Sequence, residues 1–388
     1  PVYKTTAEVR ANIKSNKERV VQQPGKLYIR GQYIFLNEVD KGVHVIDNAN
    51  PAAPKNVAFI DIPGNVDIAV KGNILYADLY TDLVAVDITD PLQAKVTKVV
   101  EDVFPHRKYN NYWMVDSTKV ITEWVMKDTT VTDKYSIGGW GRLESTTFVS
   151  DRVAFSNGGS SPLANMSGAG AGIGGSMARF TVVADQLYTV GMQELTVFNI
   201  ANPAQPSYVA ERFIGMNIET IFPFKDRLFI GSSNGMYIYS IANPTAPEQL
   251  GQFSHVRSCD PVIADDNYAY VTLRSGTACQ GFTNQFEVLN ITKLMQPSLV
   301  KTYAMTNPHG LSKDGNLLFI CDGRDGLKVY NAAKPDGLQL LQTIGNMETF
   351  DVIAYNGIAI VVAKDGLYQY DYSSPSNLKL LSRLSISL

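Results

Sequence analysis

Charged and polar residues recur at an equivalent position in the units of an internal repeat, and they are the residues best suited to chemistry. The set comprises Lys26, Asp67, Arg179, Glu219, Thr220, Asp260, His309 and Asp351. If these positions converge, the set could bind a polar ligand, a cation or sugar hydroxyls, and its acids with His309 could act as proton donors and acceptors. The alternative is a hydrated lining without a ligand. His106 and Arg107 follow the second unit and could join either arrangement.

Short catalytic and cofactor motifs do not support an assignment. Gly170, Gly172 and Gly175 satisfy G-x-G-x-x-G, but a dinucleotide fingerprint needs a strand before it and a helix after it, and here a polar loop precedes and a strand pattern follows. We interpret the tract as a loop near a channel mouth. The G-x-S-x-G match at 231–235 falls in a hairpin. The four histidines show no short metal-ligand spacing. We predict no catalytic residue, no metal site and no cofactor.

The elements that would position these residues come from a repeat of about 40 residues. Each unit has a short apolar run, a small polar anchor and, usually four residues later, a proline. The anchors are Asp47, Asp87, Asn199, Ser240, Asn290, Asn331 and Asp371, and the prolines are Pro51, Pro91, Pro203, Pro244, Pro335 and Pro375, with Leu294 in the fifth unit. The anchor side chain can hydrogen-bond the backbone two residues on, and proline fixes φ, so each pair should end a strand.

Each unit is typical of four short strands. Third strands such as 195–198 are apolar at three of four positions, which indicates cover on both faces. The predicted fold class is all-β: a seven-bladed β-propeller of four-stranded blades over residues 25–388, with a long insertion at 104–176 between blades 2 and 3. An eight-bladed ring with a degenerate blade in the insertion, and an open β-solenoid, are the alternatives.

The first and last units each own four strands, so we expect the ring to close by packing between blades rather than by an exchanged strand. Residues 1–24 form an N-terminal tail, in which Thr5 to Glu8 has the spacing of a capping box and predicts a short helix around 6–15. Pro1 is not a translation start, so we expect an upstream segment to have been removed.

The long insertion holds all three tryptophans, Trp113, Trp124 and Trp140. Tyrosines and basic residues lie near them. Clustered aromatic residues could stack on sugar rings or hold a protein partner, so we take Trp113 and Trp140 as candidate ligand-binding residues. The alternative is a small core of the insertion itself.

Three cysteines bear on the compartment. Cys259 lies where the inner strand of the fifth unit begins, and Cys279 lies in the turn between its second and third strands, which is on the same side of a blade. A disulfide between them would stabilise by roughly 3 kcal/mol and fit an oxidising compartment, whereas the alternative is two free thiols. Cys321 sits among apolar residues and is expected to be buried.

Composition excludes several classes of protein. The chain has 388 residues, 45% of them hydrophobic, and a formal net charge of -3. This many aromatic residues with so small a net charge argues against disorder, and the charge argues against nucleic acid or a polybasic membrane surface as the partner. We expect no nucleic-acid partner.

Several runs resemble a known repeat. The runs 42–51, 83–91 and 195–203 (LTVFNIANP in the last) are similar to the LVIVD-repeat proteins of bacterial cell envelopes, and residues 24–102 resemble members from Bacteroidetes. This resemblance implies an exported protein of the periplasm or outer membrane, attached to the membrane only through a lipidated cysteine in the removed N-terminal segment. It implies little about activity.

Two classes of function remain. The first is a non-enzymatic envelope module that binds a glycan, a peptide or a protein, or acts as a scaffold. The second is an envelope hydrolase or lyase that uses Asp67, Asp260 or Asp351 with His309, which requires suitable separation and exposure of the carboxylates.

Overall fold

The computed structural model describes most of the chain. It covers residues 1–104, 118–123, 125–126, 159–160, 172–255, 261–275 and 283–387. Part of the predicted site lies outside the described residues, namely Asp260, His106, Arg107, Trp113, Trp140 and the predicted Cys259–Cys279 disulfide.

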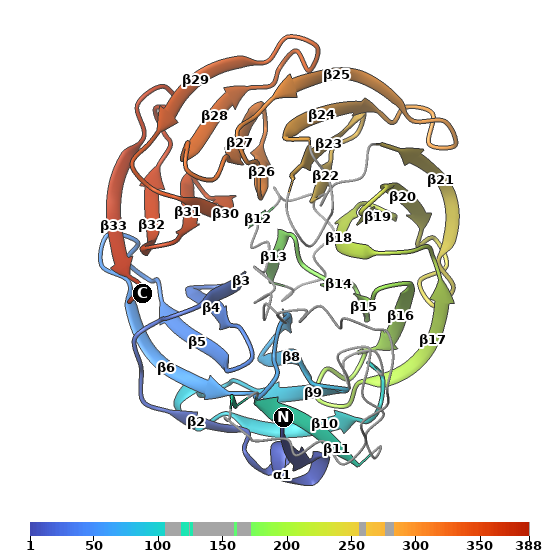
Figure 1. Cartoon of the computed structure of the whole chain (residues 1–388), viewed down its shortest axis with the longest axis vertical. Helices are drawn as coiled ribbons and strands as arrows, with labels where there is room; N and C mark the ends of the chain where they lie inside the picture. The colour runs from blue at the N-terminus through green and yellow to red at the C-terminus, as the bar shows by residue number, and fades with distance from the viewer. Residues whose placement is uncertain are drawn as a thin grey trace, which may run out of the picture.

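Seven four-stranded antiparallel sheets are arranged as blades around a ring, which confirms the predicted β-propeller (Figure 1). Blades 1 to 4 are built from β3 (Pro24–Arg30), β4 (Tyr33–Glu38), β5 (Gly42–Asp47) and β6 (Lys55–Asp61); β7 (Ile68–Lys71), β8 (Ile74–Leu79), β9 (Asp82–Asp87) and β10 (Lys95–Val100); β14 (Phe180–Val183), β15 (Gln186–Val190), β16 (Glu194–Asn199) and β17 (Ser207–Phe213); and β18 (Ile218–Phe224), β19 (Arg227–Ser232), β20 (Gly235–Ser240) and β21 (Glu248–Ser254).

Blades 5 to 7 repeat this order from the inner to the outer strand. They are β22 (Val262–Ala264), β23 (Tyr268–Leu273), β24 (Gln285–Asn290) and β25 (Ser298–Ala304); β26 (Leu311–Asp314), β27 (Leu317–Cys321), β28 (Leu327–Asn331) and β29 (Gln339–Ile344); and β30 (Thr349–Tyr355), β31 (Ile358–Ala363), β32 (Gly366–Asp371) and β33 (Lys379–Ser385). A 3-10 turn, η1 (Pro91–Gln93), precedes β10.

The remaining strands attach to this ring or stand beside it. β2 (Lys14–Asn16) pairs with the outer edge of blade 1, and β12 (Gly159–Ser160) and β13 (Ile173–Ser176) extend the same sheet inward. β1 (Val2–Thr5) pairs with β11 (Lys119–Glu123) in a separate two-stranded ribbon. The described parts of the insertion therefore do not form an eighth blade.

The repeated polar anchors end the third strands as predicted. In each blade the anchor side-chain oxygen accepts a hydrogen bond from the backbone N–H two residues later, at 2.7 to 3.2 Å. This Asx or Ser turn satisfies a backbone donor locally and turns the chain toward the outer strand. The same hydrogen bond forms in all seven blades, and it needs only a side-chain oxygen close to the backbone. The anchor can therefore be Asp, Asn or Ser.

The repeated prolines also join neighbouring blades. The hydroxyl of Tyr76 in blade 2 donates to the carbonyl of Pro203 in blade 3, and the hydroxyl of Tyr188 in blade 3 donates to the carbonyl of Pro244 in blade 4, both at 2.8 Å. Proline lacks an N–H, but its carbonyl remains a full acceptor.

Replacing Tyr188 by phenylalanine removes one such hydrogen bond between blades and keeps the aromatic ring. We expect Tyr188→Phe to lower the free energy of unfolding by about 1 kcal/mol, the usual net value of a hydrogen bond. Tyr208→Phe is the matched control, since the Tyr208 ring is 52% exposed. Equal losses for the two variants in chemical denaturation would contradict a role for the link.

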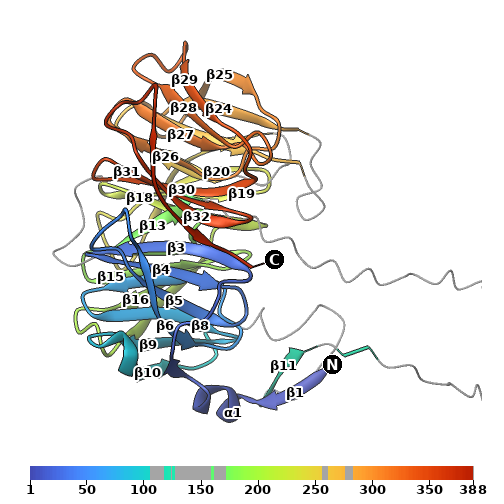
Figure 2. The same cartoon turned by 90° about the vertical axis from the view of Figure 1, so that its left-hand side faces the viewer.

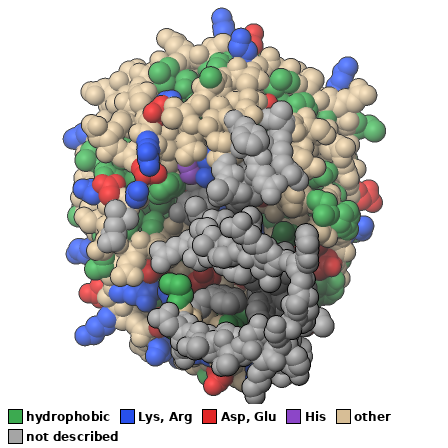
Figure 3. Space-filling model, in the orientation of Figure 1, with side chains coloured by type: hydrophobic (Ala, Val, Ile, Leu, Met, Phe, Trp, Pro, Cys, Tyr) green, Lys and Arg blue, Asp and Glu red, His purple; other side chains and the backbone are tan. Residues whose placement is uncertain are grey.

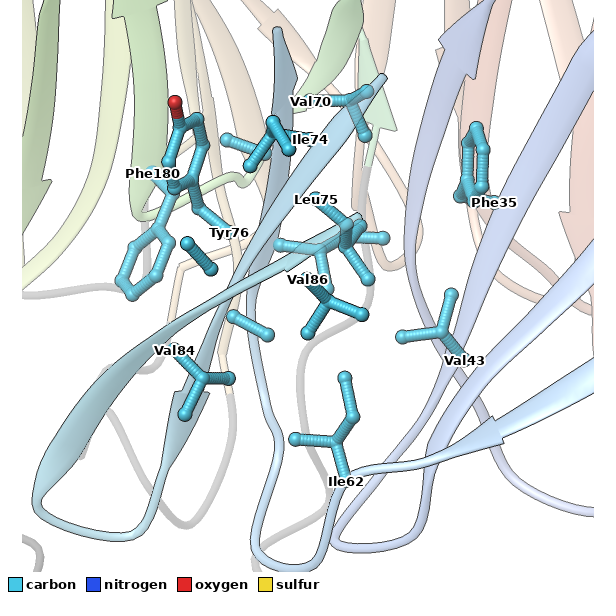
Figure 4. Close-up of a cluster of buried hydrophobic side chains, with 14 of the residues drawn as sticks. Phe35, Val43, Ile62, Val70, Ile74, Leu75, Tyr76, Val84, Val86 and Phe180 are labelled. Atoms are coloured by element: carbon cyan, nitrogen blue, oxygen red, sulfur yellow. The ribbon is translucent and has the colours of Figure 1, made fainter. Parts of the chain in front are cut away.

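The hydrophobic core lies between blades. Side chains of blade 1 (Phe35 and Val43), blade 2 (Leu75 and Val86) and blade 3 (Phe180) fill the space between successive sheets (Figure 4). Each of these side chains is at most 1% exposed, and burial of one such side chain stabilises by about 1.5 to 3 kcal/mol. Cover on both sheet faces explains the continuous apolar runs of the third strands.

The ring closes where blade 7 meets blade 1, with four strands of one continuous segment in each. The side-chain amides of Asn48 and Gln369 exchange two hydrogen bonds, at 2.9 and 2.6 Å, and the hydroxyl of Ser382 donates to the carbonyl of Pro51. The N-terminal tail adds a parallel bridge between Val21 and Ile386.

The N-terminal helix is shorter than the sequence predicts. α1 (Thr6–Ala11) begins with the capping box formed by Thr5 and Glu8, but it ends before residue 12 because 14–16 pair with β6. Among the described residues, no helix has the length and apolar character needed to span a membrane.

Candidate functional site

One face of the disc gathers the starts of the inner strands, the turns between second and third strands, and the ends of the outer strands. We call it the loop face. Both chain termini lie on this side of the disc (Figure 2). Charged and hydrophobic side chains of the described residues surround its centre (Figure 3).

The centre of the ring is filled by chain. β13 pairs with β3, the inner strand of blade 1, and lies against inner strands of blades 4, 6 and 7 (Figure 1). β12 pairs with β13 and lies against β26 and β30. We call β12, β13 and residues 172, 177 and 178 the plug. The sequence predicts a loop near the mouth for this glycine-rich tract, whereas its last residues enter the channel as a strand.

Glycine is required in the plug because the backbone runs against an aromatic ring. A Cβ at Gly172 would lie 2.3 Å from a ring carbon of Tyr28, and a Cβ at Gly174 would lie 2.8 Å from the same ring. Real Cβ atoms do not approach so closely, so any larger residue would displace the plug or the ring. The Ser176 hydroxyl accepts a 3.5 Å hydrogen bond from the backbone N–H of Leu311 in blade 6.

Lys26 and Asp67 lie under the plug. The ammonium group of Lys26 donates to the carbonyl of Met177 at 2.6 Å, and the Asp67 carboxylate accepts the backbone N–H groups of Arg179 at 2.7 Å and Ile68 at 2.8 Å. Asp67 is fully buried. Burial raises the pKa of Asp67 to about 6, with Lys26 and the Arg179 N–H partly offsetting the rise.

Lys26 is a cation that interacts electrostatically with several acids of the channel. Burial lowers the pKa of Lys26, while Asp67, Asp351 and Glu219 favour its charged form and Arg179 opposes it. The five groups come from blades 1, 2, 3, 4 and 7, so the ring brings together residues that are distant in sequence. Their convergence is the arrangement that the repeat alignment predicts; whether it binds a ligand stays a prediction.

Asp351 is the most unusual member of the set. It is fully buried, and neither carboxylate oxygen accepts a well-aligned hydrogen bond from the part of the chain that the structure describes. Burial raises the pKa of Asp351 to about 8, partly offset by Lys26 and by the Val352 amide beside it. At neutral pH this group is mostly a neutral carboxylic acid, so it adds little negative charge to the channel.

A second group of charges lies between blades 3, 4 and 5. Arg179 donates from Nε to the carbonyl of Glu219 at 3.3 Å. Arg274 follows β23 and is half-buried. Burial lowers the pKa of Arg274, and Glu219 is the charge that opposes this shift. Sequence alignment on the inner strands misses Arg274, because it follows a second strand.

His309 and Thr220 are buried rather than offered to solvent. His309 is 4% exposed and Thr220 is 1% exposed. The His309 ring meets the Phe350 ring edge to face, with centroids 5.4 Å apart, and its Nε2 lies 3.2 Å from the Asn307 amide nitrogen. This environment holds the ring within blade 6 and leaves little of it exposed to solvent.

Asp78 is a structural residue that the sequence pattern also misses. Its Oδ1 accepts from the Asn65 amide and from the backbone N–H groups of Val66 and Asp67, at 2.8 to 3.0 Å. The carboxylate thereby holds the chain that delivers Asp67 to the channel. Cys321 is buried as expected, and burial raises the pKa of its thiol.

Exposed apolar side chains gather on the loop face at the boundary of blades 3 and 4. Met192, Phe213 and Met216 are 47%, 70% and 51% exposed. We call these three the apolar patch. Phe213 also lines a cavity of about 440 Å³ at the rim, together with Arg212 and Tyr239. Within the described residues, no group of three or more His, Cys, Asp or Glu is placed to hold a metal ion.

Comparisons with known proteins agree with the fold. Residues 64–94 match the family model of the LVIVD repeat. No curated protein matches the chain. The computationally designed Ika8 protein is similar in structure, with 10% identity over 96% of this chain and 92% of that chain and a TM-score of 0.55.

Two natural propellers of known structure are also similar. Sqt1 from Saccharomyces cerevisiae has 8% identity over 96% of this chain and 87% of that chain, with a TM-score of 0.53. BamB from Moraxella catarrhalis has 7% identity over 95% and 97%, with a TM-score of 0.51. At these identities the likeness shows the fold alone.

Proposed function

We propose that this chain is a non-enzymatic binding or scaffold module that takes a protein partner on its loop face, as an exported protein of the bacterial cell envelope. The observation that carries the proposal is a contrast in solvent exposure on this face: acidic side chains are buried, whereas apolar side chains are exposed. Asp67 and Asp351 are fully buried, whereas Phe213 is 70% exposed.

The burial of the acids counts against the alternative of an envelope hydrolase or lyase. A general acid or base must come within hydrogen-bond reach of its substrate. Asp67 already accepts two backbone N–H groups, Asp351 is sealed from solvent, and His309 is held against Phe350. A polar ligand would have to displace the plug to reach these groups.

The composition of the exposed surface favours a protein partner over a glycan. Methionine, aromatic residues and arginine are enriched at protein interfaces, and flexible methionines adapt to apolar side chains. The apolar patch offers two methionines and one phenylalanine. The export in the proposal comes from the envelope location that the resemblance to LVIVD-repeat proteins implies, and residues 64–94 match the model of that repeat.

Photo-crosslinking in the native bacterium tests the proposal. A photoreactive phenylalanine analogue placed at Phe213 or Met216 of the full-length protein should give one discrete adduct with an exported protein, identified by mass spectrometry and reproduced with that purified protein. The matched control is Asn316, an exposed residue of the β26–β27 turn on the opposite face. Adducts of equal yield from Asn316, adducts with cytosolic proteins, or no adducts at all would contradict the proposal.

A further inference from the structure

We propose that the rim between blades 3 and 4 carries a strand-binding groove, in which an extended segment of the protein partner pairs antiparallel with β17 at residues 211–213. The segment has an apolar residue opposite Phe213 and a lysine or arginine opposite Glu211. The inference rests on the proposed function, and it names the kind of segment that docks and the bonds that hold it.

Blade 1 shows how such a groove is filled from within the chain. β2 pairs antiparallel with the last three residues of β6, and Ser15 at its centre lies opposite Ile60. The other side of β2 lies against η1, before the outer strand of blade 2. There the Ser15 hydroxyl donates to the carbonyl of Pro91 at 2.9 Å and accepts the backbone N–H of Ala94 at 2.8 Å. The rim of a blade can therefore hold a fifth strand.

The end of β17 corresponds to the part of β6 that β2 covers. In blade 1, Gly42 opens the third strand and pairs with Asp61, the last residue of β6. In blade 3, Glu194 opens the third strand and pairs with Phe213, the last residue of β17. Residues 211–213 therefore stand where β2 pairs in blade 1. In the described part of the chain β17 is the last strand of its sheet, so its outer edge is open to a further strand.

The second wall of the groove corresponds to the chain that Ser15 contacts. Pro247 follows the anchor of its blade by seven residues, as Ala94 does in blade 2. A cavity of about 440 Å³ lies between residues 211–213 and residues 247–249, and β17 and β21 follow one another along the rim (Figure 1). The cavity thus has the same two walls that hold β2.

Between other blades a side chain of the outer strand reaches this second wall. The Tyr303 hydroxyl of blade 5 accepts the backbone N–H of Leu338 at 3.0 Å, and the Gln342 side chain of blade 6 accepts that of Leu378 at 2.7 Å. Blade 4 has Pro247 at the same position, which has no N–H to be satisfied. The wall makes no such demand on blade 3, and the cavity remains.

The backbone of β17 presents donors and acceptors to this cavity. The N–H of Ile214 donates to the carbonyl of Gln193, directly opposite, at 2.8 Å. Bonded and non-bonded pairs alternate along an antiparallel ladder, so Arg212 bonds β16, whereas the N–H and C=O groups of Glu211 and Phe213 face outward. An added antiparallel strand would exchange main-chain hydrogen bonds with these two residues.

The side chains set the sequence of the segment. Phe213 is 70% exposed, and a β-branched or aromatic residue opposite it adds a cross-strand contact. The walls carry two acids, Glu211 and Glu248, and one base, Arg212, so a basic residue two positions later, opposite Glu211, matches the charge. Phe213 is also a member of the apolar patch, and the groove therefore continues the surface proposed to bind the partner.

A peptide derived from β2 is the probe. It covers residues 10–18 with Lys14→Val and Asn16→Lys, which places valine opposite Phe213 and lysine opposite Glu211. Saturable binding to the full chain is measured by fluorescence anisotropy. Hydrogen exchange should slow at the backbone amides of residues 211–213 when the peptide binds.

Two methylated peptides separate strand pairing from side-chain contact. Methylation of the backbone nitrogen at position 14 removes the bond to the Phe213 carbonyl and should weaken binding about fivefold, the usual net value of one hydrogen bond. Methylation at position 15 is the matched control, because that N–H points away from β17, and it should change the affinity little.

A matched pair of protein variants tests the same bonds. Glu211→Pro removes an outward N–H and leaves the bonds to β16, as proline does on an edge strand, and it should weaken peptide binding at least about fivefold. Thr302→Pro is the control, at the equivalent exposed position of β25. If Glu211→Pro did not fold, the methylated peptides would carry the test, and Glu211→Gln would measure the contribution of charge alone.

The outcomes separate this inference from the proposed function. The inference is overturned if the peptide does not bind, if the two methylated peptides bind alike, or if exchange at residues 211–213 does not slow. It is also overturned if Glu211→Pro leaves the yield of the Met216 photo-adduct in the native bacterium unchanged, or if that adduct is a second copy of this chain. The binding module stands while an adduct with another exported protein persists. Absence of any adduct from the wild-type protein overturns the two together.

Discussion

Asp351→Asn should make the protein more stable at pH 8, by on the order of 4 kcal/mol in the free energy of unfolding. The usual pKa of an aspartate is 3.8, and burial raises that of Asp351 to about 8. Between these values the folded protein keeps the proton while the unfolded chain releases it. The stability of the wild type therefore falls as the pH rises through this window, at about 1.4 kcal/mol per unit.

Asparagine has nearly the same shape as aspartic acid and does not ionise, so the variant does not lose stability as the pH rises. The gain should shrink steadily toward pH 4, close to the usual pKa, and vanish below it, where the wild-type carboxyl is protonated in both states. Denaturation midpoints at pH 4, 6 and 8 measure the trend. Asp371→Asn is the matched control, since asparagine is the natural anchor in three other blades.

The contribution of Asp371 to stability should depend on pH in the opposite direction. Hydrogen bonds from Ser373 lower the pKa of Asp371, so its contribution to stability is present above pH 4 and is lost as the pH falls. If Asp351→Asn were no more stable than the wild type at pH 8, the Asp351 carboxylate would have to be ionised and fully satisfied by Lys26.

The ring could be predicted from the sequence because its determinants are local. Each anchor residue makes the same bond to a backbone N–H two positions away, and each proline follows at a fixed offset, so the pattern survives as a period of about 40 residues. Lys26, Asp67, Arg179, Glu219 and Asp351 could be predicted to converge for the same reason, since each lies near the start of an inner strand.

The plug and the environment of the acids could not be predicted in this way. Gly172 and Gly174 carry no periodic signal, and their position depends on close approach to Tyr28, which lies in the inner strand of blade 1, far away in the sequence. The repeat alone predicts an open channel mouth, whereas the plug fills the channel and the acids beneath it are buried. Arg274 also falls outside the repeat alignment, because it follows a second strand rather than opening an inner strand.

Lys26→Met should destabilise the protein by about 3 kcal/mol at pH 8, because it keeps the aliphatic stem and removes the cation that serves the buried Asp67. It also removes the donor to the Met177 carbonyl, which holds the plug. Lys26 lowers the pKa of Asp67 in the wild type, so its loss should raise this pKa above about 6. Denaturation at pH 5 and pH 8 measures the effect.

The cost of Lys26→Met should therefore be smaller at pH 5, where Asp67 can take up a proton in the folded state, than at pH 8, where the carboxylate must stay charged or the chain unfold. The loss should also be smaller when the variant is made in an Asp67→Asn background, because the two side chains interact directly. Lys301→Met, on the exposed outer strand β25, should have almost no effect. A cost that is the same at both pH values and in both backgrounds would mean that Lys26 acts only through its bond to the plug, and that the buried acids of the channel do not depend on its charge.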